Sequence, residues 1–310
     1  MKIEVVLTEA DIAQEFTEAV QARDVPEKFF FWSPHSARTW LSLSDDPVLY
    51  GGLAATWGAL AGESRALARN LAAKVPVISL GAGDGARDRM LMEGLKQAGA
   101  QCHYFPVDAS QTLLELACAG ADDDDFETTG IKADISSPVH LVYAADAAEP
   151  PRLFISSGNT LGGFDPLAEI RYFAQPLRDG DYLLLDGELY DEKETMARRE
   201  HASVRSFLAA MLTGIGIGGD DGEVRFDHKL DERHQGLHLI TRSFRAGRDL
   251  SASVGGQQVP LERGERMGLN FQYVYSADSF RWLLREQGGL AIEREYLSPD
   301  GRFLTALCRK

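Results

Sequence analysis

The sequence has few cysteines, no long hydrophobic run and no basic leader, and each shortage excludes a class of protein. No apolar stretch reaches the roughly 18 residues that a membrane helix needs, and Met1 to Glu9 lacks the basic-then-apolar layout of a signal peptide. The cysteines are odd in number and match no zinc or redox spacing, so a disulfide framework is not expected; they are Cys102, Cys118 and Cys308. We therefore expect a cytoplasmic protein with no membrane partner.

Positive charge is also scarce. The 310 residues carry 47 acidic and 32 basic side chains, which gives a net charge of −15. Such a field repels phosphate backbones, so nucleic acid is not expected as a partner, whereas a small molecule is. The oligomeric state stays open, with a homodimer as one option.

Metal-ligand spacing is absent as well. The run from Asp122 to Asp125 predicts a solvated loop, because carboxylates adjacent in sequence do not converge on one ion. His234 and His238 are four residues apart, but they lie in a stretch that we interpret as strand or turn. No metal is expected.

What the sequence does contain is an alternation of apolar strands and helices. Buried strands are predicted at 75–80, 102–107, 153–156 and 182–185, with a weaker one closed by Asp134, and helices at 63–73, 86–98 and 110–119. This alternation is typical of βαβ units and a parallel sheet. Residues 290–296 and 302–308 flank the turn Ser298-Pro299-Asp300-Gly301 and predict a terminal β-hairpin.

The predicted fold is α/β: a doubly wound, Rossmann-like core with a terminal β-hairpin, plus a smaller α+β subdomain on the substrate side. The core comprises 61–186 and 266–310, and the subdomain 1–60 and 187–265. Aromatic residues crowd 27–60, which favours packing over a pocket wall. Residues 187–265 hold a polar helix at about 191–212 and a glycine cluster that permits hinging. Whether this segment closes over the substrate as a lid stays open.

Glycines at 81, 83 and 85 follow the first core strand and let the backbone approach a ligand closely. The helix after them points its N-terminal amides at that ligand. Asp108 ends the second strand, where a carboxylate accepts hydrogen bonds from ribose hydroxyls. Together these residues predict a nucleoside cofactor, and Gly81, Gly83 and Ala86 even satisfy a dinucleotide pattern.

The terminal hairpin separates the two cofactor classes. Dinucleotide-binding folds usually continue with parallel units, whereas an antiparallel hairpin closes the sheet of most S-adenosylmethionine (SAM) methyltransferases. The sequence also lacks the catalytic His or Tyr-x-x-x-Lys arrangement of a dehydrogenase. SAM is therefore the predicted cofactor, and a NAD oxidoreductase is a poor alternative.

Four segments carry a more specific resemblance: 77–92, 104–110, 153–164 and 181–191. In order and spacing they resemble the histidine Nα-methyltransferases of ergothioneine biosynthesis, a family with relatives that methylate other amino-acid amines. The stretch from Gly158 to Phe164 is similar to the family's G-S-T-I-G-N-F signature. The resemblance covers about 25–310 and is patchy at the N-terminus and over 195–260.

The resemblance implies roles for individual residues. For the cofactor, it places glycines 81, 83 and 85 under the methionine moiety, Asp108 and Ser110 at the ribose, and Asp134 at the adenine amino group. The methyl-transfer face would be lined by Ser156, Ser157 and Gly158. Tyr50 and Asn159 fall on the substrate side.

Three further substrate-side positions depart from the family. The signature's Asn is Gly163 here, and Asn270 and Gln272 stand where the family has a Glu and a Ser that contact imidazole. An amide in place of a carboxylate removes a charge-assisted partner. The prediction is a SAM-dependent N-methyltransferase of secondary metabolism whose acceptor is a small amine or amino acid other than histidine.

No catalytic group is assigned, because methyl transfer depends mostly on positioning. Groups near the carboxyl ends of the strands that could take up the ammonium proton are Tyr190, Tyr273, Tyr275, Asp186 and Glu188. Two alternatives stay open: methylation of an oxygen or carbon, and a non-catalytic SAM-binding partner subunit.

Overall fold

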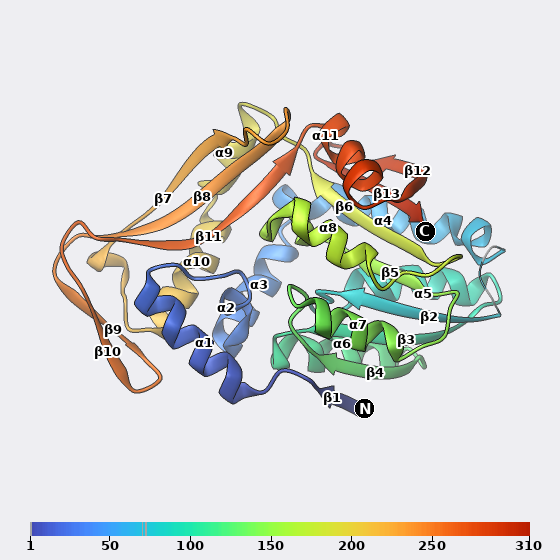
Figure 1. Ribbon diagram of the computed structural model, residues 1–310, viewed down its shortest axis with the longest axis horizontal. Helices are drawn as coiled ribbons and strands as arrows, with labels where there is room; N and C mark the ends of the chain where they lie inside the picture. Colours follow the sequence, from blue (N-terminus) through green and yellow to red (C-terminus); the bar gives the residue numbers. More distant parts are fainter. Residues whose placement is uncertain (1, 70, 72) are drawn as a thin grey trace.

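The computed structural model describes residues 2–69, 71 and 73–310, which form two lobes side by side (Figure 1). The first lobe holds one sheet in the order β1-β4-β3-β2-β5-β6-β13-β12. Its strands are β1 (Lys2–Val5), β2 (Lys74–Leu80), β3 (Gln101–Asp108), β4 (Glu127–Lys132), β5 (Leu153–Ser156), β6 (Tyr182–Glu188), β12 (Ala291–Leu297) and β13 (Phe303–Arg309). Strands β1 to β6 pair in parallel, whereas β13 is antiparallel to β6 and β12. The predicted parallel core and terminal hairpin are confirmed.

Helices cover both faces of this sheet. One face packs against α4 (Pro47–Ala68), α5 (Ala86–Gln97) and α6 (Gln111–Asp123), and the other against α7 (Pro138–Asp146), α8 (Pro166–Ala174), α11 (Ala277–Trp282) and the π-helical turn Leu283–Gln287. The buried strands are apolar on both faces, as parallel strands between two helix layers require. The doubly wound architecture is confirmed. Within the described residues, no helix has both the length and the apolar character to cross a membrane.

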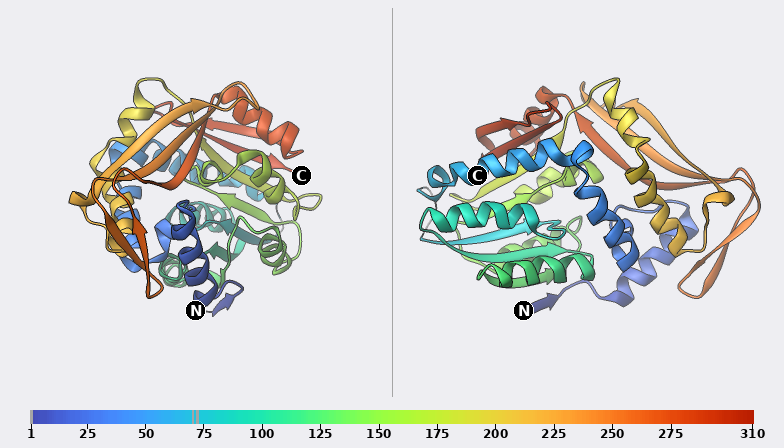
Figure 2. Two further views of the ribbon diagram at one scale, coloured as in Figure 1. Left: turned by 60° about the vertical axis from the view of Figure 1, so that its left-hand side comes forward. Right: turned by 180° about the vertical axis from the view of Figure 1, so that it is seen from behind.

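The second lobe is built from the chain's start and its later third. Its three-stranded antiparallel sheet has the order β11 (Arg266–Tyr275), β8 (Leu237–Ala246), β7 (Gly222–Leu230), and β9 (Leu250–Val254) pairs with β10 (Gln257–Leu261). The helices are α1 (Glu9–Ala22), α2 (Phe29–Trp32), α3 (Pro34–Ser44), α9 (Glu194–Arg199) and α10 (Ala202–Gly214). Seen from behind, α3 and α10 lie side by side (Figure 2). Aromatic residues fill this core, with Phe16 stacked 4.8 Å from Phe29.

Sheet pairing differs from the predicted division of the chain at two places. β1 is assigned by sequence to the subdomain, yet it pairs with β4 at the edge of the core sheet. β11 is assigned to the core, yet it pairs with β8 along nearly its whole length. β1 and β4 are more than a hundred residues apart, and β8 and β11 are separated by the β9–β10 hairpin, so hydrophobic periodicity alone does not reveal either pairing.

Three local boundaries also differ. The helix predicted over 63–73 begins instead at Pro47, because the Asp46 side chain caps it by accepting from the Val48 amide, 2.9 Å away. The polar helix predicted at 191–212 is two helices that divide at His201. The run of aspartates begins inside the last turn of α6 rather than in a loop.

Candidate functional site

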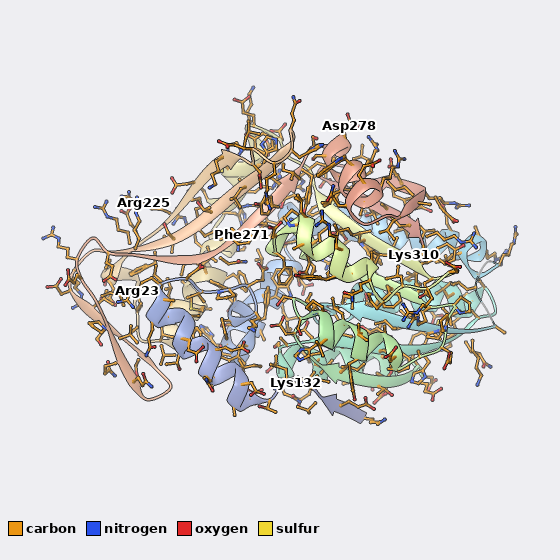
Figure 3. The ribbon with its side chains drawn as sticks, in the orientation of Figure 1. Arg23, Lys132, Arg225, Phe271, Asp278 and Lys310 are labelled. Carbon is orange, nitrogen blue, oxygen red and sulfur yellow. The ribbon has the colours of Figure 1, made fainter. Side chains whose placement is uncertain are left out.

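An open cavity of about 1200 Å³, the solvent at its mouth included, lies where the two lobes meet, at the carboxyl ends of β2, β3, β4 and β5. Both lobes line it: the first through the loops that follow these strands, the second through α2, α3, α10, β8 and β11. Phe271 marks β11 near the middle of the molecule, whereas Arg225 on β7 lies on the outer side of the second lobe (Figure 3). This is the edge of a parallel sheet at which ligands bind.

The loop between β2 and α5 forms the floor of the cavity. Gly81 and Gly83 line it in the left-handed conformation, with φ of 71° and 58°. A Cβ at Gly81 would lie 3.0 Å from the Thr160 methyl group, so glycine is favoured both by the backbone angle and by the close approach. Gly85 differs: a Cβ there would lie 2.8 Å from the Tyr104 hydroxyl, so this glycine allows α5 to pack closely and does not line the cavity.

Asp108 closes β3 and faces the same cavity. Its carboxylate accepts from the Gly83 amide at 2.9 Å and from the Ser110 amide at 2.8 Å. Burial raises the pKa of Asp108 to about 6, although these backbone hydrogen bonds act in the opposite direction. Ser110 itself is fully buried, and its hydroxyl caps α6 by accepting from the Leu113 amide. Its structural role is therefore to hold the helix, away from the cavity lining.

Asp134 lines the cavity two residues beyond β4 and joins the two lobes. Lys28, just before α2, donates to one carboxylate oxygen at 2.6 Å, and the Ser136 amide and hydroxyl donate to the other. Burial favours a higher pKa for Asp134, but Lys28 and the Ser136 hydrogen bonds outweigh it and lower the pKa. The carboxylate is thus charged and already held by the protein.

The loop after β5 is fixed by buried side chains. Ser157, Gly158 and Asn159 line the cavity, whereas Ser156 is buried behind them with its hydroxyl unpartnered among the described residues. Asp186 on β6 accepts from the Asn159 amide at 2.7 Å and the Gly158 amide at 3.1 Å.

The Asn159 side chain is committed to the protein at both ends. Its amide nitrogen donates to the Tyr273 carbonyl at 2.9 Å, and its oxygen accepts from the Glu188 amide at 3.1 Å. Both polar atoms of the side chain are therefore used within the protein, and the backbone of Asn159 is the part that is free to contact a ligand in the cavity. The structure therefore makes the Asn159 amide a brace between β6 and β11, and its contact with a substrate would be through the backbone.

A carboxylate that the sequence did not single out lies on the acceptor side. Asn270 donates to Glu27, and a Cβ at Gly163 would lie 2.5 Å from a Glu27 oxygen. Neither Gly163 nor Asn270 lines the cavity, but Glu27 does. Burial raises the pKa of Glu27, whereas Arg242 and Asn270 act to lower it. Two positions that depart from the resembled family thus face one carboxylate, supplied by the segment before α2.

Three arginines missed by the sequence analysis also line the cavity. Arg242 on β8 donates to Gln272 on β11 at 2.6 Å, and Arg199 at the end of α9 donates to Glu188 at 2.7 Å. Arg87 lies over the Tyr50 ring, 5.6 Å from its centre. Burial raises the pKa of Tyr50 to about 12, so its hydroxyl is neutral. A signal was present for Arg242, because it interrupts the apolar inward positions Ile240 and Phe244 of β8.

The groups considered for proton uptake lie outside the cavity lining. Tyr273 shares its hydroxyl with Asp231 and Arg233, Tyr275 is buried, and Tyr190 stacks on His238 with ring centres 3.6 Å apart. Asp186 accepts from the amides of Gly158 and Asn159, and Glu188 accepts from Arg199. Over residues 2–69, 71 and 73–310, no group of three or more acidic, histidine or cysteine side chains is placed to hold a metal ion.

Comparison with known families gives one match. Residues 9–310 match the model of a family described as histidine-specific, SAM-dependent methyltransferases. A search of curated proteins finds no match. The family match thus extends over nearly the entire chain.

Solved structures with a similar arrangement are distant. They include a SAM-dependent methyltransferase from Clostridium acetobutylicum (14% identity, covering 88% of this chain and 98% of that one, TM-score 0.47). Another is the CcbJ methyltransferase from Streptomyces caelestis (14% identity, covering 82% of this chain and 95% of that one, TM-score 0.40). A third is CalS10, an amino pentose methyltransferase from Micromonospora echinaspora (14% identity, covering 84% of this chain and 94% of that one, TM-score 0.40). With TM-scores below 0.5, these likenesses carry no further argument.

Proposed function

This chain belongs to the histidine-specific, SAM-dependent methyltransferase family, and from this premise we propose that it methylates the nitrogen of a small amine or amino acid other than histidine. When bound, SAM supplies an electrophilic methyl group. The proposal rests on the acceptor side of the cavity, where polar side chains meet in two pairs: Glu27 with Asn270, and Arg242 with Gln272.

The described residues fit the cofactor. Gly81 and Gly83 leave the floor of the cavity free of side chains, and both lie in a conformation that other residues rarely adopt. A carboxylate has about four acceptor sites, and Asp108 uses two of them on backbone amides. We propose that its remaining sites hold the ribose hydroxyls, that Ser157 and Gly158 lie beside the transferred methyl group, and that Asp134 accepts from the adenine amino group while keeping Lys28.

The acceptor side supports a substrate other than histidine. The resemblance implies that an imidazole is held by a glutamate and a serine at positions 270 and 272, where this chain has Asn and Gln. Asn270 is bonded to Glu27, and Gln272 to Arg242. An imidazole would therefore meet a carboxylate whose charge is opposed by a nearby guanidinium, which weakens recognition of a cationic ring.

Transfer to nitrogen needs alignment more than acid–base chemistry. The acceptor must present a neutral amine about 3 Å from the donor carbon, and positioning supplies most of the rate. Asp186 and Asn159 fix the loop that carries Ser157 and Gly158, so they act as positioning residues. None of the histidines in the described residues lines the cavity, which favours an amine over a hydroxyl that needs a base.

The test is release of S-adenosylhomocysteine (SAH) from SAM across single amino acids and small amines, histidine included. We expect turnover of a non-histidine amine, with mass and NMR spectra placing the new methyl on nitrogen. Asp108→Ala serves as the control without a cofactor site. Efficient methylation of histidine, or of lactate in preference to alanine, would contradict the proposal.

A further inference from the structure

Two buried arginines beside the cavity have hydrogen-bonding capacity that the protein leaves unused. Arg199 and Arg242 are 6% and 8% exposed, and both line the cavity. Among the residues that the structure describes, the Nε–H groups of both lack a partner. A buried, charged N–H without an acceptor is costly, so such a pair is expected to receive one from a ligand.

The partners that these arginines do have hold them rigidly. Arg242 projects inward from β8 and donates through Nη2 to the Gln272 side chain on the neighbouring strand. Arg199 donates through Nη2 to Glu188, which also accepts from Arg198. Each guanidinium is therefore fixed at one edge and unpaired at Nε, a preorganised arrangement for an acceptor with planar oxygens.

The charges around the pair add to a small positive excess. The basic groups are Arg87, Arg198, Arg199 and Arg242, and the acidic groups are Glu27 and Glu188. Burial lowers the pKa of Arg242, whereas the charge of Glu27 acts to raise it. A carboxylate would reduce this positive excess, and its two oxygens can accept from both guanidinium groups.

We propose that the methyl acceptor carries a carboxylate that binds at Arg242 and Arg199, so that the substrate is an amino acid or another amine with one free carboxylate. This inference rests on the proposed N-methyltransferase function and narrows its substrate class. Arg242 is then a specificity-determining residue: it holds the acceptor's anionic end while the amine faces the loop that carries Ser157 and Gly158.

Matched acceptors that differ in one charge test the proposal. SAH release is measured with alanine against alaninamide and with glutamate against glutamine, at saturating SAM. We expect kcat/KM for the carboxylate member of the productive pair to exceed that of the amide by about tenfold or more, the range of a charge-assisted hydrogen bond. The pair that discriminates also shows whether the α-carboxylate or a side-chain carboxylate is bound.

Variants locate the effect. Arg242→Gln should lower the preference in kcat/KM for the carboxylate acceptor over its amide about tenfold and leave the dissociation constant of SAH within about twofold. Arg242→Lys should retain part of the discrimination, since it keeps the charge and loses the fork of donors. Gln272→Glu should abolish the preference for the carboxylate acceptor over its amide in a folded protein, because the new carboxylate would pair with Arg242 in place of the substrate. Arg245→Gln is the matched control, on the same strand and exposed.

The outcomes separate the two proposals. Amine turnover without preference for the carboxylate member would overturn the carboxylate site and leave N-methylation standing. A loss of SAH affinity in Arg242→Gln as large as the loss with the acceptor would also overturn it, since the arginine would then serve the cofactor. If no amine turns over, thermal protection of the SAH-loaded enzyme by propionate over propionamide, present in wild type and lost in Arg242→Gln, supports the site; equal protection overturns it.

Discussion

The cavity has two halves that are built in opposite ways. The cofactor half comes from short loops that follow consecutive strands, so Gly81, Gly83 and Asp108 lie within 28 residues of one another along the chain. The acceptor half takes Glu27 from the segment before α2, Arg199 from α9, Arg242 from β8 and Gln272 from β11. A parallel sheet places strand ends together whatever the rest of the chain does, whereas the acceptor half exists only after the second lobe has docked.

This difference implies that the two halves can vary independently. Backbone amides and left-handed glycines hold the cofactor loop, and they tolerate little change. Side chains of the second lobe define the acceptor half, where one substitution changes charge or shape without moving the sheet.

The largest expected effect is on cofactor binding. Asp108→Ala removes the proposed ribose acceptor and the group that holds the Gly83 and Ser110 amides. We expect the dissociation constant of SAM to rise about a hundredfold, as loss of charge-assisted hydrogen bonds predicts. Calorimetry measures it, with Asp108→Asn as the partial variant that keeps the shape. An unchanged affinity would remove Asp108 from the cofactor half.

Asn159→Ala should break the connection between the halves. It leaves the Tyr273 carbonyl and the Glu188 amide without their side-chain partner, and an alanine would occupy the left-handed conformation at φ 58°. We expect the free energy of unfolding to fall by about 2 kcal/mol, measured by urea denaturation. Gln257→Ala, which removes a surface hydrogen bond to Gln21, should stay within about 0.5 kcal/mol of wild type. Equal losses in both variants would show that Asn159 is not a brace.

Cofactor affinity should also depend on pH. The pKa of Asp108 is raised to about 6, and ribose hydroxyls donate to its charged form, which lowers the pKa in the complex. SAM affinity is therefore complete above pH 7 and is lost as the pH falls through 6, by about tenfold between pH 7 and pH 5. Asp108→Asn should give a flatter profile. A wild-type affinity that does not change over this range would contradict the assignment.

The smallest effect is expected at Gly163. A Cβ there meets the carboxylate end of Glu27, which a small side-chain rotation can move away. Gly163→Ala should change KM for the acceptor about threefold and leave SAM affinity unchanged, because displacing one side chain costs under about 1 kcal/mol. Steady-state kinetics and calorimetry on the same preparation measure both. A change in SAM affinity that exceeds the change in KM would argue against two separate halves.

The difference between the two halves also explains which parts of the site can be predicted from the sequence. The glycine loop, Asp108 and the terminal hairpin were predictable because each signal is local and its spacing follows from the βαβ unit. Gly85, Ser110 and Ser156 occur in the same motifs, but the structure places them in packing and capping positions away from the cavity lining. Motif membership alone does not separate contact with a ligand from support of the loop.

The acceptor half could not be predicted from the sequence, for a different reason. Which side chains of β11 face inward depends on a bulge between Gly268 and Phe271, where Asn270 takes a left-handed conformation with φ 62°. A bulge shifts the alternation of faces by one residue, so the period of the sequence does not predict it. Glu27 reaches Asn270 because the segment before it pairs with β11: the Val25 amide donates to the Gly268 carbonyl, and the Gly268 amide donates to the Arg23 carbonyl. Glu27 and Asn270 themselves are separated by 243 positions in the sequence.

β11 connects the two lobes. It pairs with β8 along the outer sheet, and its final residue meets the core where Tyr275 bridges to Leu189 and accepts from the Tyr190 amide at 2.8 Å. The Asn159 side chain adds a second contact two residues earlier on the strand, by donating to the Tyr273 carbonyl. Loss of order in either lobe therefore breaks the hydrogen bonds that Tyr273 and Tyr275 make with the other. The protein should therefore melt as one cooperative unit with a single calorimetric transition, instead of as two foldons of separate stability.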